Sequence, residues 1–167
     1  LEFRRVLFRS SNEHATYEAI FEHLADGIYE MSNGAHKMGK ITVLDLNDGW
    51  GDDVCNPKST LRISPCHVIW RESEWPRASL AGYGKKSQRM FMGDIFPFDD
   101  DAGNPDPYDA LDAANARAVG YTFAHELGHY FYGLRDEYAV LDSDTPVPDS
   151  VMNDQWRAAQ GDRKSVV

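Results

Sequence analysis

Three residues in the stretch HELGHYFYGLRDEY, residues 125–138, are of the types that bind a metal ion and activate water. His125 and His129 are four residues apart, so a helix would place both imidazoles on one face, where they can share an ion. Glu126 directly follows the first histidine, where the H-E-x-x-H pattern of zinc peptidases has its general base. Zn²⁺ favours imidazole nitrogens and makes a bound water molecule more acidic. The spacing therefore predicts a catalytic zinc site.

The third ligand is expected from the residues that follow this helix. In the metzincin class of zinc peptidases, H-E-x-x-H-x-x-G-x-x-H, the third histidine would fall on Arg135, which cannot bind a cation. Gly133 comes one residue later than the glycine of that pattern, and the third residue after it is Asp136. A carboxylate oxygen is an accepted zinc ligand, so we expect Asp136 to complete the site, with Glu137 as second choice. A glutamate from a later helix is ruled out within this chain, because none follows Glu137.

The whole stretch resembles the H-E-x-x-H-x-x-x-G-x-x-D-E motif of the calcium-activated chloride channel regulator family. Members of that family have a metzincin-like N-terminal zinc peptidase domain. The likeness includes the additional residue before the glycine, the Asp-Glu pair and the tyrosine after it. It implies the ligands His125, His129 and Asp136, with Glu126 as base, and an extracellular, periplasmic or cell-surface location. Looser similarity in the order of elements covers most of residues 12–155.

A second stretch, DSVMND at residues 149–154, resembles the methionine-bearing turn beneath the metal in metzincins. Met152 would then be an apolar floor under the histidines and not a ligand. The alternative is an ordinary surface turn. The tyrosine that usually follows such a turn is absent, and Tyr138 is a candidate for the hydroxyl that would stabilise the transition state.

The helices that would position the site are predicted from periodicity and end signals. Apolar residues recur at helical spacing through residues 12–32, and Asn33-Gly34 would end that helix. A second helix of about 25 residues should begin at Asp106-Pro107, carry the histidines and end at Gly133 in the left-handed conformation.

Alternating and β-branched runs predict the strands, which we expect at residues 40–47, 59–65, 67–73 and 89–98. Residues 74–88 contain Pro, Gly and Ser and are expected to form a loop. The expected fold class is α/β (α+β): a metzincin-like zinc peptidase domain with a twisted mixed sheet, an N-terminal helix and a long active-site helix.

Composition narrows the class of partners. The 167 residues carry a formal net charge of −10, which argues against a nucleic-acid or anionic-membrane partner. No run of 18 apolar residues is present, so no membrane span is predicted.

Cys55 and Cys66 can form one disulfide or remain two thiols. The carboxylates of residues 99–109 lack the spacing of a calcium-binding EF-hand loop and indicate a solvated acidic turn.

Both ends differ in character from the sequence between them. Residues 1–10 are basic and apolar, residues 161–167 show a similar change, and both resemble vector-derived sequence. We therefore expect residues 11–160 to form the domain, with a non-native leader and tail on either side.

Two functions of different classes fit these patterns. The first is a zinc-dependent metalloendopeptidase that hydrolyses a peptide or protein substrate, bound extended along an edge strand near residues 89–96. The second is a catalytically silent or self-cleaving zinc-binding module of a larger cell-surface or secreted protein. Glu126 favours hydrolysis, because a purely structural zinc site needs no general base beside its ligand. The other histidines of the helices and strands, His14, His23 and His67, are expected to be structural.

Overall fold

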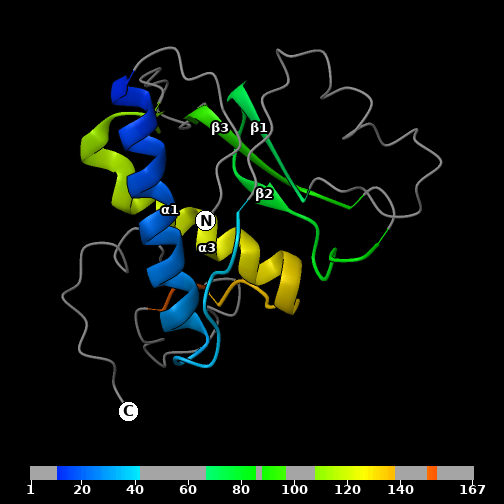
Figure 1. Cartoon of the computed structure of the whole chain (residues 1–167). Coiled ribbons are helices and arrows are strands. Elements are labelled where there is room, and N and C mark those ends of the chain that lie inside the picture. The colour runs from blue at the N-terminus through cyan, green and yellow to red at the C-terminus, as the bar shows by residue number, and fades with distance from the viewer. Residues whose placement is uncertain (1–10, 42–66, 86–87, 97–107, 138–149, 154–167) are drawn as a thin grey trace, which may run out of the picture.

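A computed structural model of the chain describes residues 11–41, 67–85, 88–96, 108–137 and 150–153. Within these ranges the protein is a mixed α and β structure, with two α-helices and a four-stranded mixed sheet (Figure 1). This agrees with the expected α/β class. Several expectations lie outside the described residues: the strand at 59–65, nearly all of the strand at 40–47, Cys55, Cys66, Tyr138, most of the acidic turn and both chain ends.

Helix α1 spans Ser11–Met31 and confirms the amphipathic helix predicted at the N-terminus. The helix ends where expected, because Asn33 (φ 51°) and Gly34 (φ 76°) both adopt the left-handed conformation that stops a helix. Its apolar stripe is buried in the core and includes Ile20, Phe21, Leu24 and Ile28.

The two longest strands of the sheet are parallel neighbours and confirm the strands predicted at 67–73 and 89–98. Strand β1 (Val68–Ser73) pairs with β3 (Met90–Phe96), from Val68 opposite Met90 to Ser73 opposite Ile95. Met90 and Met92 of β3 are fully buried on the face that the helices cover.

The expectation that residues 89–96 form an edge strand is wrong. The other side of β3 pairs with two short antiparallel strands, β2 (Arg77–Ala78) and β4 (Tyr108–Asp109). The stretch 74–88, expected to be loop, therefore contains a strand, and β2 is the edge on that side. The alternation of apolar residues predicts that a strand exists but not its place in the sheet order.

The helix that carries the histidines begins later than predicted. Helix α3 spans Ala116–Leu127, is preceded by a 3-10 turn η2 (Ala113–Asn115), and continues as a π-helical segment η3 (Gly128–Tyr132). Gly133, with φ 67°, ends it in the left-handed conformation, as predicted. Asp106 and Pro107, the predicted start, lie outside the described residues.

Side-chain hydrogen bonds explain why residues 108–115 are not part of the α-helix. The carboxylates of Asp109 and Asp112 accept hydrogen bonds from the backbone N–H groups of Leu111 and Ala114, both at 2.9 Å. Short polar side chains that bind nearby backbone groups in this way compete with the helix. In addition, Tyr108 lies opposite Phe96 in the sheet, and their rings stack with centroids 5.5 Å apart.

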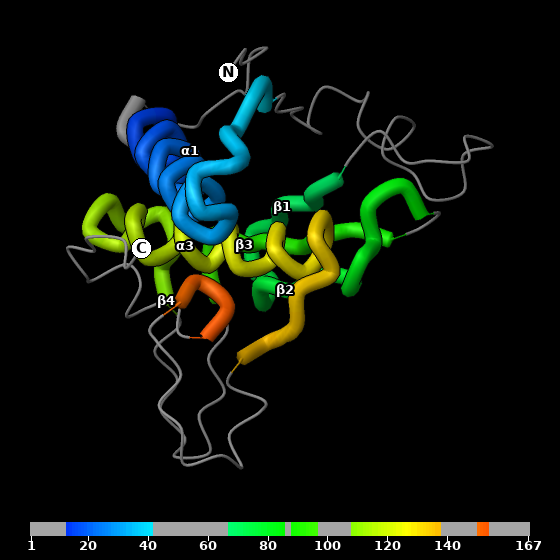
Figure 2. The backbone as a smooth tube through the Cα atoms, turned by 90° about the horizontal axis from the view of Figure 1, so that it is seen from below, coloured from blue at the N-terminus to red at the C-terminus, as the bar shows by residue number. Residues whose placement is uncertain are grey.

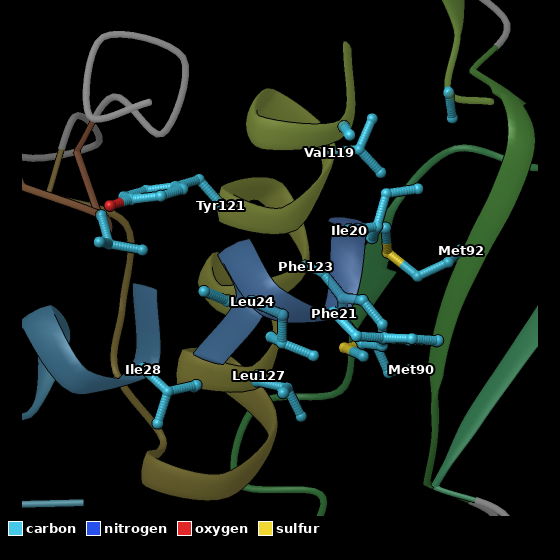
Figure 3. Close-up of a cluster of buried hydrophobic side chains, with 14 of the residues drawn as sticks. Ile20, Phe21, Leu24, Ile28, Met90, Met92, Val119, Tyr121, Phe123 and Leu127 are labelled. Carbon is cyan, nitrogen blue, oxygen red and sulfur yellow. The ribbon is translucent and has the colours of Figure 1, made fainter. Parts of the chain in front are cut away.

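Helices α1 and α3 lie side by side and share one core with β3, as Figures 1 and 2 show from two directions. Figure 3 shows the core side chains of α1 and α3 together with Met90 and Met92 of β3. Glycines permit the close approach of the helices: a Cβ on Gly120 would lie 2.7 Å from the carbonyl oxygen of Ile20. Neither helix of the described ranges is long and apolar enough to cross a membrane.

Candidate metal centre

Three side chains that the sequence predicts as ligands converge on one point. Nε2 of His125 lies 3.0 Å from Nε2 of His129, and Oδ1 of Asp136 lies 3.0 and 3.1 Å from these two nitrogens. A search of the described ranges for His, Cys, Asp and Glu side chains close enough together to hold one metal ion finds these three residues. The two histidines come from successive turns of α3 and η3, and Asp136 from the segment after Gly133.

Backbone carbonyls set the orientation of both imidazoles. Nδ1 of His125 donates a hydrogen bond to the carbonyl oxygen of Val151 at 2.9 Å, and Nδ1 of His129 donates to that of Leu134 at 2.7 Å. Because a carbonyl oxygen can only accept, the proton of each neutral ring is on Nδ1 and the lone pair of Nε2 points to the common centre. Burial lowers the pKa of His125, which favours the neutral ring.

The chemistry of these three atoms fits a cation. All three are acceptors, and Oδ1 of Asp136 is buried without a hydrogen-bond donor in the described part of the chain. Three mutually close acceptors with no proton between them repel one another unless a positive charge lies among them. Zinc bonds of about 2.0–2.1 Å in tetrahedral geometry place ligand atoms about 3.3 Å apart, so the observed triangle needs little adjustment.

Glu126 lies beside this group without being part of it. Its side chain is 7% exposed, and burial raises its pKa to about 7, with a smaller raising effect from Asp136. The side chains of His129 and Arg77 act in the opposite direction and lower the pKa of the same carboxyl group. A carboxyl group with a pKa near neutrality, next to a ligand group, is suited to take up and release a proton.

Met152 lies under the turn of helix that separates the two histidines. It is 4% exposed, and a Cβ built on Gly128 would be 2.5 Å from its Sδ and 2.8 Å from Sδ of Met31. Met152 is thus a packing neighbour of the helix at the place where the predicted apolar floor would be. The neighbouring Val151 supplies the carbonyl oxygen that orients His125.

Glu137, the second-choice ligand, has a different set of contacts. Its carboxylate oxygen Oε2 accepts a hydrogen bond from the hydroxyl of Ser150, and its backbone N–H donates to the carbonyl oxygen of Met152 at 3.1 Å. Through these two contacts, Glu137 connects the segment after the helix to the turn at 150–153, which lies beside α3 in Figure 2. Asp136 and not Glu137 is the acidic residue in the ligand group.

The edge strand β2 leads directly to the candidate site. After β2 the chain passes along the end of the helix, where the backbone N–H of Ala81 donates to the carbonyl oxygen of His129 at 2.8 Å. Two residues later, the N–H of Tyr83 donates to the carbonyl oxygen of Tyr130 at 3.1 Å. These bonds fix residues 81–83 beside η3, which carries the ligand His129.

The remaining histidines of the prediction are outside this group. His14 lies 3.4 Å from a carboxylate oxygen of Glu18, His23 lies 3.6 Å from one of Asp26, and the ring of His67 stacks with Tyr83. Three contributors to the site were not predicted from the sequence, namely the carbonyls of Leu134 and Val151 and the hydroxyl of Ser150. Backbone carbonyls carry no sequence signal, because every residue has one.

In comparisons with known proteins, no family model matches the sequence, and neither a curated protein nor a solved structure matches the chain.

Proposed function

We propose that this protein is a zinc-dependent metalloendopeptidase in which His125, His129 and Asp136 hold the ion and Glu126 is the general base. The observation that supports this most strongly is the convergence of three proton-free ligand atoms next to a buried carboxyl group. The likeness of residues 125–138 to the motif of the chloride channel regulator family supports the same function and a location outside the cytoplasm.

Zn²⁺ in this site would supply a Lewis acid for the carbonyl oxygen and would increase the acidity of water. The carboxylate of Glu126 would accept the proton of the water molecule as its oxygen attacks the peptide carbonyl carbon. The same carboxyl group would then donate that proton to the leaving amine nitrogen. Burial of Glu126 keeps bulk water away from this transfer.

The peptide substrate is best placed along β2. In the described part of the chain no strand pairs with the outer side of β2, whereas both sides of β3 are paired. An extended peptide can add to a free strand edge through backbone hydrogen bonds. Because the chain that follows β2 is hydrogen-bonded to His129 and Tyr130 at residues 81–83, such a peptide would pass the candidate site.

The test is cleavage of a mixed peptide library by the full chain loaded with one equivalent of zinc, read by mass spectrometry. Glu126→Gln should lower the cleavage rate by at least about 100-fold, because the amide cannot accept the proton. Glu22→Gln, the same change on the exposed face of α1, is the matched control and should cleave like the wild type.

Equal cleavage by wild type and Glu126→Gln would contradict the role of Glu126. Absence of cleavage by the wild type, with zinc bound and the chain folded, would favour the second function, a silent or self-cleaving zinc-binding module.

A further inference from the structure

We propose that Glu137 and Ser150 form a clasp that positions two of the three metal ligands without touching the ion. The inference rests on the metal site of the proposed function but not on peptidase activity. It assigns Glu137 the role of a positioning residue, and Ser150 that of its partner.

The Glu137–Ser150 clasp joins two segments that are 13 residues apart in the sequence. The hydroxyl of Ser150 donates to Oε2 of Glu137, and the backbone N–H of Glu137 donates to the carbonyl oxygen of Met152 at 3.1 Å. The hydroxyl oxygen of Ser150 also accepts a hydrogen bond from the N–H of Asn153 at 3.1 Å, which closes the turn. Side chain and backbone of Glu137 thus bind the same turn.

Each half of the clasp is adjacent in the sequence to a residue that is a metal ligand or orients one. Glu137 follows Asp136, so fixing its backbone N–H fixes the peptide unit from which the aspartate side chain projects. Ser150 precedes Val151, whose carbonyl oxygen orients His125. The clasp and this backbone bond together therefore set the position of Asp136 relative to His125, two ligands that come from different parts of the fold.

The same contact explains why Glu137 is not itself a ligand. Its carboxylate oxygen is engaged by Ser150, and it is not part of the group formed by His125, His129 and Asp136. Groups that orient metal ligands typically contribute about 10–100-fold to metal affinity. We expect a loss of that size when either half of the clasp is removed.

The experiment measures the zinc dissociation constant of the full chain by competition with a chromophoric chelator. Glu137→Ala and Ser150→Ala should each weaken zinc binding by about 10–100-fold. The double variant should be no weaker than the stronger single effect, because both changes remove the same contact. Glu137→Gln keeps a hydrogen-bond acceptor and should recover most of the affinity, and Glu22→Ala on α1 is the matched control.

A second measurement separates positioning from folding. The wild type and variants are loaded with Co²⁺, whose d–d absorption bands depend on ligand geometry, and far-ultraviolet circular dichroism checks that each variant is folded. Loss of the clasp should shift the bands of Glu137→Ala and Ser150→Ala, while Glu137→Gln should keep the wild-type spectrum.

Unchanged zinc affinity and cobalt spectra in Glu137→Ala and Ser150→Ala would overturn the clasp and leave the proposed function intact. Additive effects in the double variant would also overturn it, because the two residues would then act separately. A wild type that binds no zinc would overturn both the clasp and the proposed function.

Discussion

The helix formed by α3 and η3 has two parts with different tasks. The part up to Ala124 lies in the core against α1, where Val119 and Ala124 are fully buried and Gly120 touches the backbone of α1. From His125 onward the helix carries the two histidines that meet at the ligand group, although Leu127 and Tyr130 still belong to the core. Apolar packing holds the first part, whereas hydrogen bonds to carbonyls of the segments at 134 and 151 orient the two histidines of the second part.

This difference indicates that stability and metal affinity can be changed separately. Core packing fixes where the helix lies, and the polar contacts after it decide how the ligand atoms face one another. Changes in the first part should alter the free energy of unfolding, and changes in the second part should alter zinc binding.

The largest effect should come from removing a ligand. Asp136→Ala or His129→Ala should weaken zinc binding by more than about 100-fold, the upper end of what outer contacts contribute, because a direct bond to the ion is lost. At a free zinc concentration of 100 times its dissociation constant, the wild type should gain about 2.7 kcal/mol of stability, and these variants should gain little. Chelator competition and chemical denaturation with and without zinc measure both quantities.

Without metal, Asp136→Ala should be no less stable than the wild type, because Oδ1 of Asp136 is buried with no hydrogen-bond donor in the described ranges. His14→Ala, on the half-exposed side of α1, is the matched control for His129→Ala. A marked loss of metal-free stability in Asp136→Ala would show that the second part also holds the fold together.

A smaller effect, on stability and not on zinc binding, is expected when Gly120 in the first part of the helix is changed. The Cβ of Gly120→Ala would lie 2.5 Å from Cβ of His23, 2.7 Å from the carbonyl oxygen of Ile20 and 2.9 Å from the N atom of Leu24. Two of these are backbone atoms, so α1 and α3 must move apart, and the gain in helix propensity does not offset this. We expect a loss of about 2 kcal/mol in the free energy of unfolding, measured by urea denaturation.

Gly39→Ala is the matched control, because nothing lies within 4 Å of its Cβ. The zinc affinity of Gly120→Ala should remain within a factor of about three of the wild type, since the ligand group and Gly120 share no contact. A large loss of zinc affinity in Gly120→Ala would mean that the two parts of the helix are coupled.

The sequence was informative where a local rule decides the structure. Residues four apart on a helix share a face, so the pairing of His125 and His129 could be predicted from spacing alone. Counting from Gly133 also selected Asp136, since the left-handed glycine fixes where the chain turns back toward the helix. Helix α1 followed from its periodicity and its Asn-Gly end signal.

The predictions that went wrong depended on partners distant in the sequence. The start of α3 was missed because Tyr108 and Asp109 pair with β3, a tertiary contact that a helix-like pattern does not reveal. The edge strand was missed because strand order is decided by how β2 and β4 fold back on β3. The contact between Glu137 and Ser150 was not predicted either, because the two residues are 13 apart in the sequence and no local pattern indicates that they meet.

The most direct test of the central claim is the zinc K-edge X-ray absorption spectrum of the full chain with one equivalent of zinc. We predict only nitrogen and oxygen neighbours at about 2.0–2.2 Å, with the multiple scattering of two imidazoles. His129→Ala should lose one imidazole contribution. A sulfur neighbour at about 2.3 Å, or a spectrum of hydrated zinc without imidazole, would contradict a site built from His125, His129 and Asp136.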